Sequence, residues 1–250
     1  MKRNLENKLA VITGGAQGIG YSITDKFLRK GARLVIIIDI DDRQGLASVE
    51  RLKSKYGVDR AEFIKCDVTT DIDAATRKIF DKHSSIDVLV NNSGILNEFM
   101  IQKTVGIDVT ALMEWSVMFF ERMRMDKGGR GGIVINMASI YGFRVDPFLP
   151  IYQGLKFAVI GFTRSFGHPY RYKKFGVRAV AVCSGFTETK STTDVKVNDD
   201  PSFQKDLDGM LKSVPWQQVE AVTNAVVDVF EKGDSGTAWL IEGSKPITQV

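Results

Sequence analysis

Three side chains in the second half of the sequence could together remove a proton from an alcohol. Tyr152 and Lys156 are four residues apart in a helical pattern that begins at Pro150, so both side chains project from the same helix face. A neighbouring ammonium group stabilises a phenolate and lowers a pKa that is otherwise about 10, so such a tyrosine can act as a base near neutral pH. Ser139 closes the preceding apolar run and can hold the same substrate oxygen. Taken alone, the Tyr–Lys spacing is more typical of a chance pair on a helix surface, so the surrounding elements decide.

The segment KLAVITGGAQGIG, residues 8–20, has the pattern of a buried strand, a glycine-rich turn and the start of a helix. Its glycines follow the spacing G-x-x-x-G-x-G. Glycine lets the backbone approach a pyrophosphate, and the free N–H groups at the helix start face that anion. Glycine clusters also serve ordinary tight turns, and motif matches include false positives. The segment predicts a dinucleotide site formed by Gly14, Gln17, Gly18, Ile19 and Gly20.

Asp39 ends a second apolar run, residues 34–38, and lies 19 residues beyond Gly20. A carboxylate at this strand end can accept hydrogen bonds from both adenosine ribose hydroxyls and repels a 2′-phosphate. The alternative is a turn or cap carboxylate, a role that suits Asp41 and Asp42. Position favours Asp39 as the ribose ligand.

Apolar runs alternate with helical patterns along the whole chain. Strands are expected at residues 9–12, 34–38, 61–66, 86–90, 133–137, 177–183 and 237–241. This alternation predicts an α/β fold, a single doubly wound Rossmann domain over residues 1–250, with an approximately seven-stranded parallel sheet and helices on both faces. Gly14, Asp39, Asp67 and Asn91 fall at carboxyl ends of strands, where such sheets bind ligands. Residues 187–212 are polar and irregular, which predicts a flap over the ligand.

The long helical pattern at residues 104–125 is rich in bulky apolar residues, including Leu112, Trp115 and Phe119. One face can cover the sheet, and the surplus suggests a second buried face. We expect that face to be a subunit contact.

Composition excludes several other classes of protein. The 250 residues are 44% hydrophobic and 26% charged, with a formal charge of +4, and the cations are scattered where a nucleic-acid footprint needs a continuous basic face. No apolar run approaches the ~20 residues of a membrane span, and MKRNLENK lacks a signal-peptide segment. Cys66 and Cys183 close predicted strands, so we expect neither a disulfide nor a metal site. These features predict a reducing, cytoplasmic location.

The sequence resembles the short-chain dehydrogenase/reductase family. The resemblance is carried by TGGAQGIG (13–20), CDV (66–68), NNSG (91–94), Ser139, the Tyr152–Lys156 pair and CSGFTET (183–189). Their joint order and spacing cover nearly the whole chain. NMAS with YGF, IYQGLKFAVIGFTRS and GTAWLIEG look most like the branch of insect alcohol dehydrogenases and 15-hydroxyprostaglandin dehydrogenases.

The resemblance implies how a cofactor would bind. The glycine-rich turn would take the pyrophosphate, and Asp39 the adenosine ribose. Tyr152 and Lys156 would meet the nicotinamide ribose. Further contacts along the cofactor would come from Asp67, Val68, Asn91, Thr187 and Thr189. Gly15 and Ile40 stand where relatives that prefer a 2′-phosphate often carry a basic residue, so NAD is the expected cofactor. In the family the long helix and the Tyr152 helix pair across a two-fold axis, which implies a homodimer or homotetramer.

Two residues depart from the family pattern. Asp108 occupies the position where the family commonly places an Asn that organises a water relay behind the lysine, and Ser184-Gly185 replaces a Pro-Gly. A carboxylate at 108 changes the electrostatics of the Tyr–Lys pair. Two functions therefore stay open: an NAD-dependent alcohol dehydrogenase that uses Ser139, Tyr152, Lys156 and Asp108, or a catalytically weak NAD-binding relative with a binding, storage or regulatory role.

Overall fold

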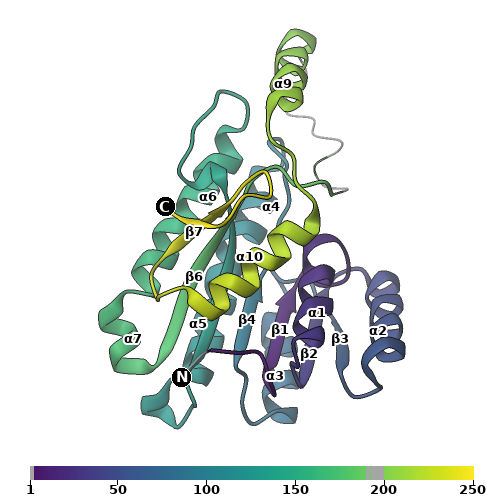
Figure 1. Cartoon of the computed structure of the whole chain (residues 1–250), viewed down its shortest axis with the longest axis vertical. Coiled ribbons are helices and arrows are strands. Elements are labelled where there is room, and N and C mark those ends of the chain that lie inside the picture. Colours follow the sequence, from purple (N-terminus) through teal and green to yellow (C-terminus); the bar gives the residue numbers. More distant parts are fainter. Residues whose placement is uncertain (1–2, 190–191, 193–199) are drawn as a thin grey trace.

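A computed structural model describes residues 3–189, 192 and 200–250, and its central feature is a twisted sheet (Figure 1). Within the described residues the strand order is β3-β2-β1-β4-β5-β6-β7-β8. The strands are β1 (Leu9–Thr13), β2 (Leu34–Asp39), β3 (Ala61–Lys65), β4 (Val88–Asn91), β5 (Gly132–Ser139), β6 (Val177–Ser184), β7 (Ala238–Ile241) and β8 (Thr248–Gln249). The first seven are parallel, and β8 runs antiparallel to β7. The strand order reverses between β1 and β4, which is where doubly wound sheets open a ligand crevice.

Helices cover both faces of this sheet. The longer ones are α1 (Gly18–Arg29), α2 (Asp42–Tyr56), α3 (Ile72–Lys82), α5 (Leu112–Met123), α6 (Pro150–Phe166), α9 (Pro201–Ser213) and α10 (Val219–Lys232). The shorter ones are α4 (Ile101–Val105), α7 (Pro169–Phe175) and the turns η1 (Gly106–Ala111), η2 (Met125–Lys127) and η3 (Ile140–Gly142).

Each strand sends alternate side chains to opposite helical layers, because side chains alternate along a β-strand. Ala10 and Ile12 of β1 pack with α1, α2 and α10, and α10 lies in front of the central strands in Figure 1. Leu9 and Val11 pack on the other face with α3 and α5. Both faces are buried, which explains the continuous apolar runs of the parallel strands.

The expected α/β class and doubly wound arrangement are confirmed. The prediction of about seven strands missed β8, a two-residue edge strand with exposed side chains. It is too short to leave a periodic signal in the sequence.

The expected helix at residues 104–125 begins earlier, at Ile101, and contains an irregular turn. Its segment η1, Gly106–Ala111, is a π-helix between α4 and α5. Single π turns inside helices are frequent at functional sites, and this one carries Asp108.

The predicted flap at residues 187–212 is only partly irregular. Residues 190–191 and 193–199 lie outside the described residues, but α9 forms a 13-residue helix with Asp200 as its N-cap. The prediction of irregular structure was therefore wrong for α9, where Pro201 occupies a position that suits the first turn of a helix. In the described part of the chain, no helix has the length and apolarity to cross a membrane.

Candidate active site

The glycine-rich turn between β1 and α1 has a shape that only glycine adopts easily. Gly14 and Gly18 have φ values of +61° and +54°, in the left-handed region that strains other residues. A Cβ on Gly18 would meet no protein atom within 4 Å, whereas one on Gly20 would collide with the Gly14 carbonyl. The turn is therefore open along one edge and tightly packed along the other, which fits a ligand that approaches the backbone closely.

Side chains after β4 hold this turn in place. The Thr13 hydroxyl accepts hydrogen bonds from the backbone N–H groups of Asn92 (3.0 Å) and Ser93 (3.1 Å). The Asn92 amide donates to the Gly14 carbonyl at 3.0 Å. These contacts join the ends of β1 and β4 at the point where the strand order reverses.

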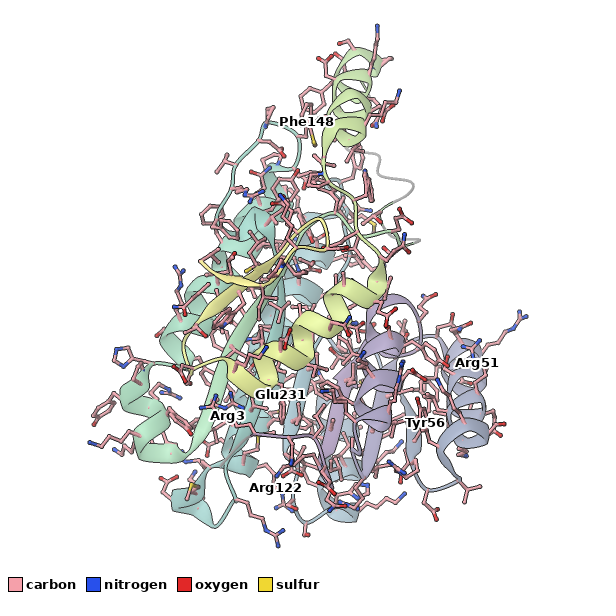
Figure 2. The ribbon with its side chains drawn as sticks, in the orientation of Figure 1. Arg3, Arg51, Tyr56, Arg122, Phe148 and Glu231 are labelled. Carbon is pink, nitrogen blue, oxygen red and sulfur yellow. The ribbon has the colours of Figure 1, made fainter. Side chains whose placement is uncertain are left out.

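Asp39 faces the same crevice from the end of β2. Its carboxylate accepts hydrogen bonds from the backbone N–H groups of Ala16 (3.0 Å) and Asp41 (3.1 Å). Arg51 also lines this end of the cavity from α2, near the outer edge of the molecule in Figure 2. Its guanidinium lies 5.0 Å from the centre of the Tyr21 ring and donates to Ser48 at 2.8 Å. Asp39 and Arg51 therefore bring a carboxylate and a guanidinium group to the same cavity.

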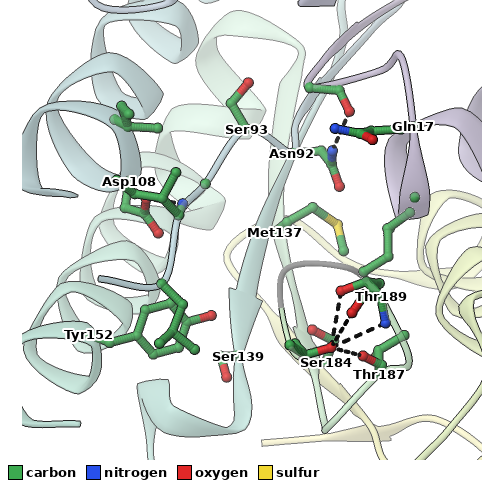
Figure 3. Close-up of a pocket in the computed structure, with 18 of the residues that line it drawn as sticks. Gln17, Asn92, Ser93, Asp108, Met137, Ser139, Tyr152, Ser184, Thr187 and Thr189 are labelled. Atoms are coloured by element: carbon green, nitrogen blue, oxygen red, sulfur yellow. Dashed lines mark hydrogen bonds between the residues drawn. The ribbon is translucent and has the colours of Figure 1, made fainter. Parts of the chain in front are cut away.

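The structure brings most of the predicted cofactor residues to one cavity of about 930 Å³, which is in the upper range for ligand and cofactor pockets. The predicted cofactor residues in its lining are Gly14, Gln17, Gly18, Ile19, Asp39, Asp67, Val68, Thr187 and Thr189. The lining also includes the predicted catalytic residues Ser139, Tyr152, Lys156 and Asp108. Figure 3 shows Gln17, Thr187 and Thr189 on the opposite side of this cavity from Tyr152 and Asp108. Gly20 packs behind the turn.

Asn91 does not line this cavity, and its contact with a cofactor stays a prediction. Its side chain is buried between β5 and α5 and donates to Asn136 at 2.9 Å and to Ser116 at 2.9 Å. Asn91 follows Leu89 by two residues on β4, so it points to the same α5 face. The neighbouring Asn92 and Ser93 line the cavity instead.

Ser139, Tyr152 and Lys156 meet at the other end of this cavity. Ser139 is the last residue of β5, and its Oγ accepts the N–H of Tyr141 at 3.2 Å. Tyr152 lies in the first turn of α6, and Lys156 Nζ is 5.1 Å from the centre of its ring. Tyr152 and Ser139 face each other in Figure 3. A strand end and a helix start, separated in sequence, thus present a phenol, a hydroxyl and an ammonium group to one space.

Asp108 reaches the same group of side chains from the π-helical turn. Its Oδ2 lies 2.8 Å from Lys156 Nζ, and the two side chains are 0% and 7% exposed. Its Oδ1 accepts the backbone N–H of Ile95 at 2.8 Å. A Cβ on Gly94 would lie 3.2 Å from Oδ2, so the glycine leaves room for the carboxylate. Asp108 is therefore the buried counter-ion of Lys156.

These neighbours act on Tyr152 in opposite directions. Burial raises the pKa of Tyr152, the Lys156 charge and a hydrogen bond with Ser139 lower it, and the Asp108 carboxylate raises it, with a net increase. Burial would lower the pKa of Lys156, but Asp108 and Tyr152 outweigh burial and raise it. Lys156 consequently stays protonated near neutral pH, and the free protein keeps Tyr152 as a neutral phenol.

Glu98 holds the start of the helix that carries Tyr152. Its two carboxylate oxygens accept the backbone N–H groups of Ile151 (2.9 Å) and Tyr152 (2.8 Å). Such a contact satisfies donors that a helix start leaves free, and its charge suits the positive end of the helix dipole. Glu98 is thus a positioning residue for Tyr152.

Sequence reasoning missed Glu98, Asn92 and Arg51. Glu98 lies 54 residues before Tyr152, and no local pattern links a loop carboxylate to a distant helix start. Asn92 could have been found from the sequence, because it lies in the NNSG motif next to Asn91, the residue that was predicted. In the described part of the chain, no cluster of three or more His, Cys, Asp or Glu side chains could hold a metal ion.

Comparisons with known proteins show which sequences and structures this chain resembles. The short chain dehydrogenase family pattern matches residues 8–200. Rat (Rattus norvegicus) 15-hydroxyprostaglandin dehydrogenase [NAD(+)] is 29% identical over 251 residues, which span 98% of this chain and 94% of the relative. Alcohol dehydrogenase 1 of Ceratitis cosyra is 29% identical over 240 residues, spanning 95% of this chain and 92% of the relative.

A solved structure shows the same fold. L-Sorbose reductase from Gluconobacter frateurii, complexed with NADPH and L-sorbose, superimposes with a TM-score of 0.80 at 23% identity, covering 97% of this chain and 98% of the other. With the family pattern matched over residues 8–200, this chain belongs to the short-chain dehydrogenase family.

Proposed function

We propose that the protein is an NAD-dependent oxidoreductase that moves a hydride between a secondary alcohol and the corresponding ketone. The observation that supports this best is the meeting of Ser139, Tyr152 and Lys156 in the cavity that the glycine-rich turn also lines. A nucleic-acid role has no comparable support.

Each of the three side chains has one task in this proposal. Tyr152, as the phenolate, takes the proton of the substrate hydroxyl, and Ser139 donates a hydrogen bond to the same oxygen. Lys156 favours the phenolate through its positive charge. A bound NAD would supply the acceptor for the hydride of the alcohol carbon, so oxidation would leave a ketone, reduced cofactor and the transferred proton on Tyr152. In the reverse direction the Tyr152 hydroxyl returns the proton.

Asp39 supports NAD as the cofactor over NADP. Short-chain dehydrogenases use nicotinamide cofactors, and the sorbose reductase, complexed with NADPH, shows that the fold alone does not choose between them. A carboxylate at the ribose position accepts hydrogen bonds from two hydroxyls and repels a phosphate. The neighbouring Ile40 is 62% exposed and offers a phosphate no charge. Arg51, the cation at this end of the cavity, already contacts Ser48 and the Tyr21 ring.

One observation favours a second candidate, a catalytically weak NAD-binding protein. The Asp108 carboxylate lies against Lys156 and offsets the positive charge that would favour the Tyr152 phenolate. If that offset dominates, the protein binds NAD and a ligand without appreciable turnover.

The deciding experiment is an absorbance assay for NADH with purified protein, NAD and a panel of secondary alcohols between pH 7 and 10. We expect NAD reduction that increases with pH and depends on Tyr152. Tight NAD binding with no reduction of NAD at any pH would favour the second candidate instead.

A further inference from the structure

The catalytic end of the cavity is bounded by an apolar cluster drawn from several parts of the chain. Its buried members are Ile140, Tyr141, Leu149 and Leu207, and Tyr152 packs against them. The members that line the cavity include Leu96, Ile140, Leu149, Phe186, Leu207 and Leu211. Ser139 and Tyr152 therefore open onto a surface made of hydrocarbon.

Helix α9 supplies part of this surface. It projects at the upper end of the molecule in Figure 1, yet Leu207 is 0% exposed. Phe203, Leu207 and Leu211 are four residues apart, so they share one helix face. The rings of Phe148 and Phe203 lie 5.3 Å apart, and Phe148 is visible beside α9 in Figure 2. One face of α9 thus packs toward the catalytic end of the cavity.

Cations in the described lining of the cavity are engaged elsewhere or exposed. Lys156 is paired with Asp108 at 2.8 Å. Arg51 is held by Ser48 and Tyr21 on the α2 side. Lys103 lines the cavity from α4 and is exposed. The described members of the apolar cluster include no cationic side chain to pair with the carboxylate of an anionic substrate.

We propose that the substrate is a neutral secondary alcohol with a long apolar substituent, which packs against Leu149, Phe186, Leu207 and Leu211 while its hydroxyl meets Tyr152 and Ser139. This inference rests on the proposed dehydrogenase function. Removal of apolar surface from water provides the specificity, and each buried methylene is worth about a threefold to fourfold gain in binding.

The test compares 2-propanol, 2-butanol, 2-hexanol and 2-octanol with NAD at one pH. We expect kcat/KM to rise about threefold per methylene until the alkyl chain of the alcohol covers the apolar cluster. If the short alcohols react as well as the long ones, the inference is wrong and the dehydrogenase function stands. If no alcohol reacts, the proposed dehydrogenase function is wrong. The preference for a long apolar substituent is then tested by the binding affinities of the alcohols.

Binding is measured with the Tyr152→Phe variant, which keeps the aromatic ring that packs against the apolar cluster. In the presence of NAD, calorimetric titration should show 2-octanol binding more than tenfold tighter than 2-butanol. Equal affinities would overturn the inference, whatever the activity.

Two variants of α9 test whether this helix contacts the apolar substituent of the substrate. Leu207→Ala should lower kcat/KM for 2-octanol about fivefold or more and leave the value for 2-propanol nearly unchanged. Lys205→Ala, an exposed position on the same helix, should change neither. An equal loss for both alcohols in Leu207→Ala would give Leu207 a purely structural role and contradict the assignment.

An anionic competitor tests the neutral charge of the substrate. Here 7-hydroxyoctanoate, with the same carbon skeleton as 2-octanol, should react more slowly than 2-octanol. A faster reaction that Lys103→Met abolishes would show that the site selects a carboxylate and would overturn the proposal.

Discussion

The Nζ of Lys156 and the Oδ2 of Asp108 lie 2.8 Å apart in a pair almost closed to solvent. The Asp108 side chain is fully buried, and the charged neighbour of its carboxylate is Lys156. An Asn at this position would turn its NH₂ group toward the ammonium or lose the bond from Ile95, so Asp and Asn are not equivalent here.

Asp108→Asn should move the pH profile of alcohol oxidation. The carboxylate raises the pKa of Tyr152, so its removal should lower that pKa, by about one unit if the lost interaction is about 1.4 kcal/mol. Because kcat/KM rises as the phenol ionises, the rising limb should shift to lower pH. Glu114→Gln, at an exposed position on α5, should leave the limb unmoved.

The same variant leaves Lys156 without a partner, so its thermal unfolding must be recorded. Breaking a buried ion pair costs about 3 kcal/mol or more, and we expect a lower Tm. Activity lost without any shift of the limb would show that Asp108 has a positive role of its own.

Tyr152→Phe should remove turnover and leave NAD binding nearly intact, because only the proton-transferring oxygen is lost. General acid–base groups contribute about 10²- to 10⁴-fold to reaction rates. We therefore expect kcat to fall by a factor of about 10² or more. The control is Tyr170→Phe, which removes a phenol from a 68% exposed position on α7, and this variant should stay active. Substantial activity in Tyr152→Phe would refute the assignment.

Asp39→Ala should relax cofactor choice. The carboxylate that would meet two ribose hydroxyls and repel a phosphate is removed, so the ratio of NADP to NAD affinity should rise about tenfold or more. Asp42→Ala, at an exposed position in the first turn of α2, serves as the control. Equal affinities of the unmodified protein for NAD and NADP would contradict the proposal before any mutation is made.

Glu98→Ala should lower both stability and activity. It removes the acceptor for two N–H groups at the start of α6, a loss worth about 1 kcal/mol. We expect a lower Tm and a several-fold decrease in kcat, with NAD affinity less affected. Glu98→Gln keeps one acceptor oxygen and should fall between the two proteins. Asn97→Ala, which removes the acceptor for two backbone N–H groups in the same loop without touching α6, should spare kcat.

Assembly remains a prediction. Much of the apolar content of residues 104–125 packs into the core, but Val117 on α5 stays 46% exposed and Phe157 on α6 44% exposed. We expect light scattering at micromolar concentration to give at least a dimer. The double variant Val117→Glu/Phe157→Glu should dissociate it, and Tyr170→Glu on α7, at a 68% exposed position, should not. A monomeric mass for the native protein would contradict the prediction.

The sequence alone determined the features that depend on local periodicity and on residue type. Buried parallel strands appear as continuous apolar runs, and helices show their apolar stripe every three or four residues. The glycine turn, Asp39 at the end of β2, Ser139 at the end of β5 and the Tyr152–Lys156 pair on α6 could all be placed in this way. Each of these predictions uses residues close together in the chain or ends of elements whose order the fold class sets.

Only the tertiary structure decided the contacts between distant segments. Lys156 and Asp108 are 48 residues apart and meet because a π turn directs Asp108 toward α6. Asn91, and not Asn92, faces the core because side chains alternate on β4, so an error of one position changes the face. The apolar side of α9 could not be assigned to the cavity from its own pattern. A sequence pattern can predict that a side chain is buried. The packing of segments that are distant in the sequence determines which side chains it contacts.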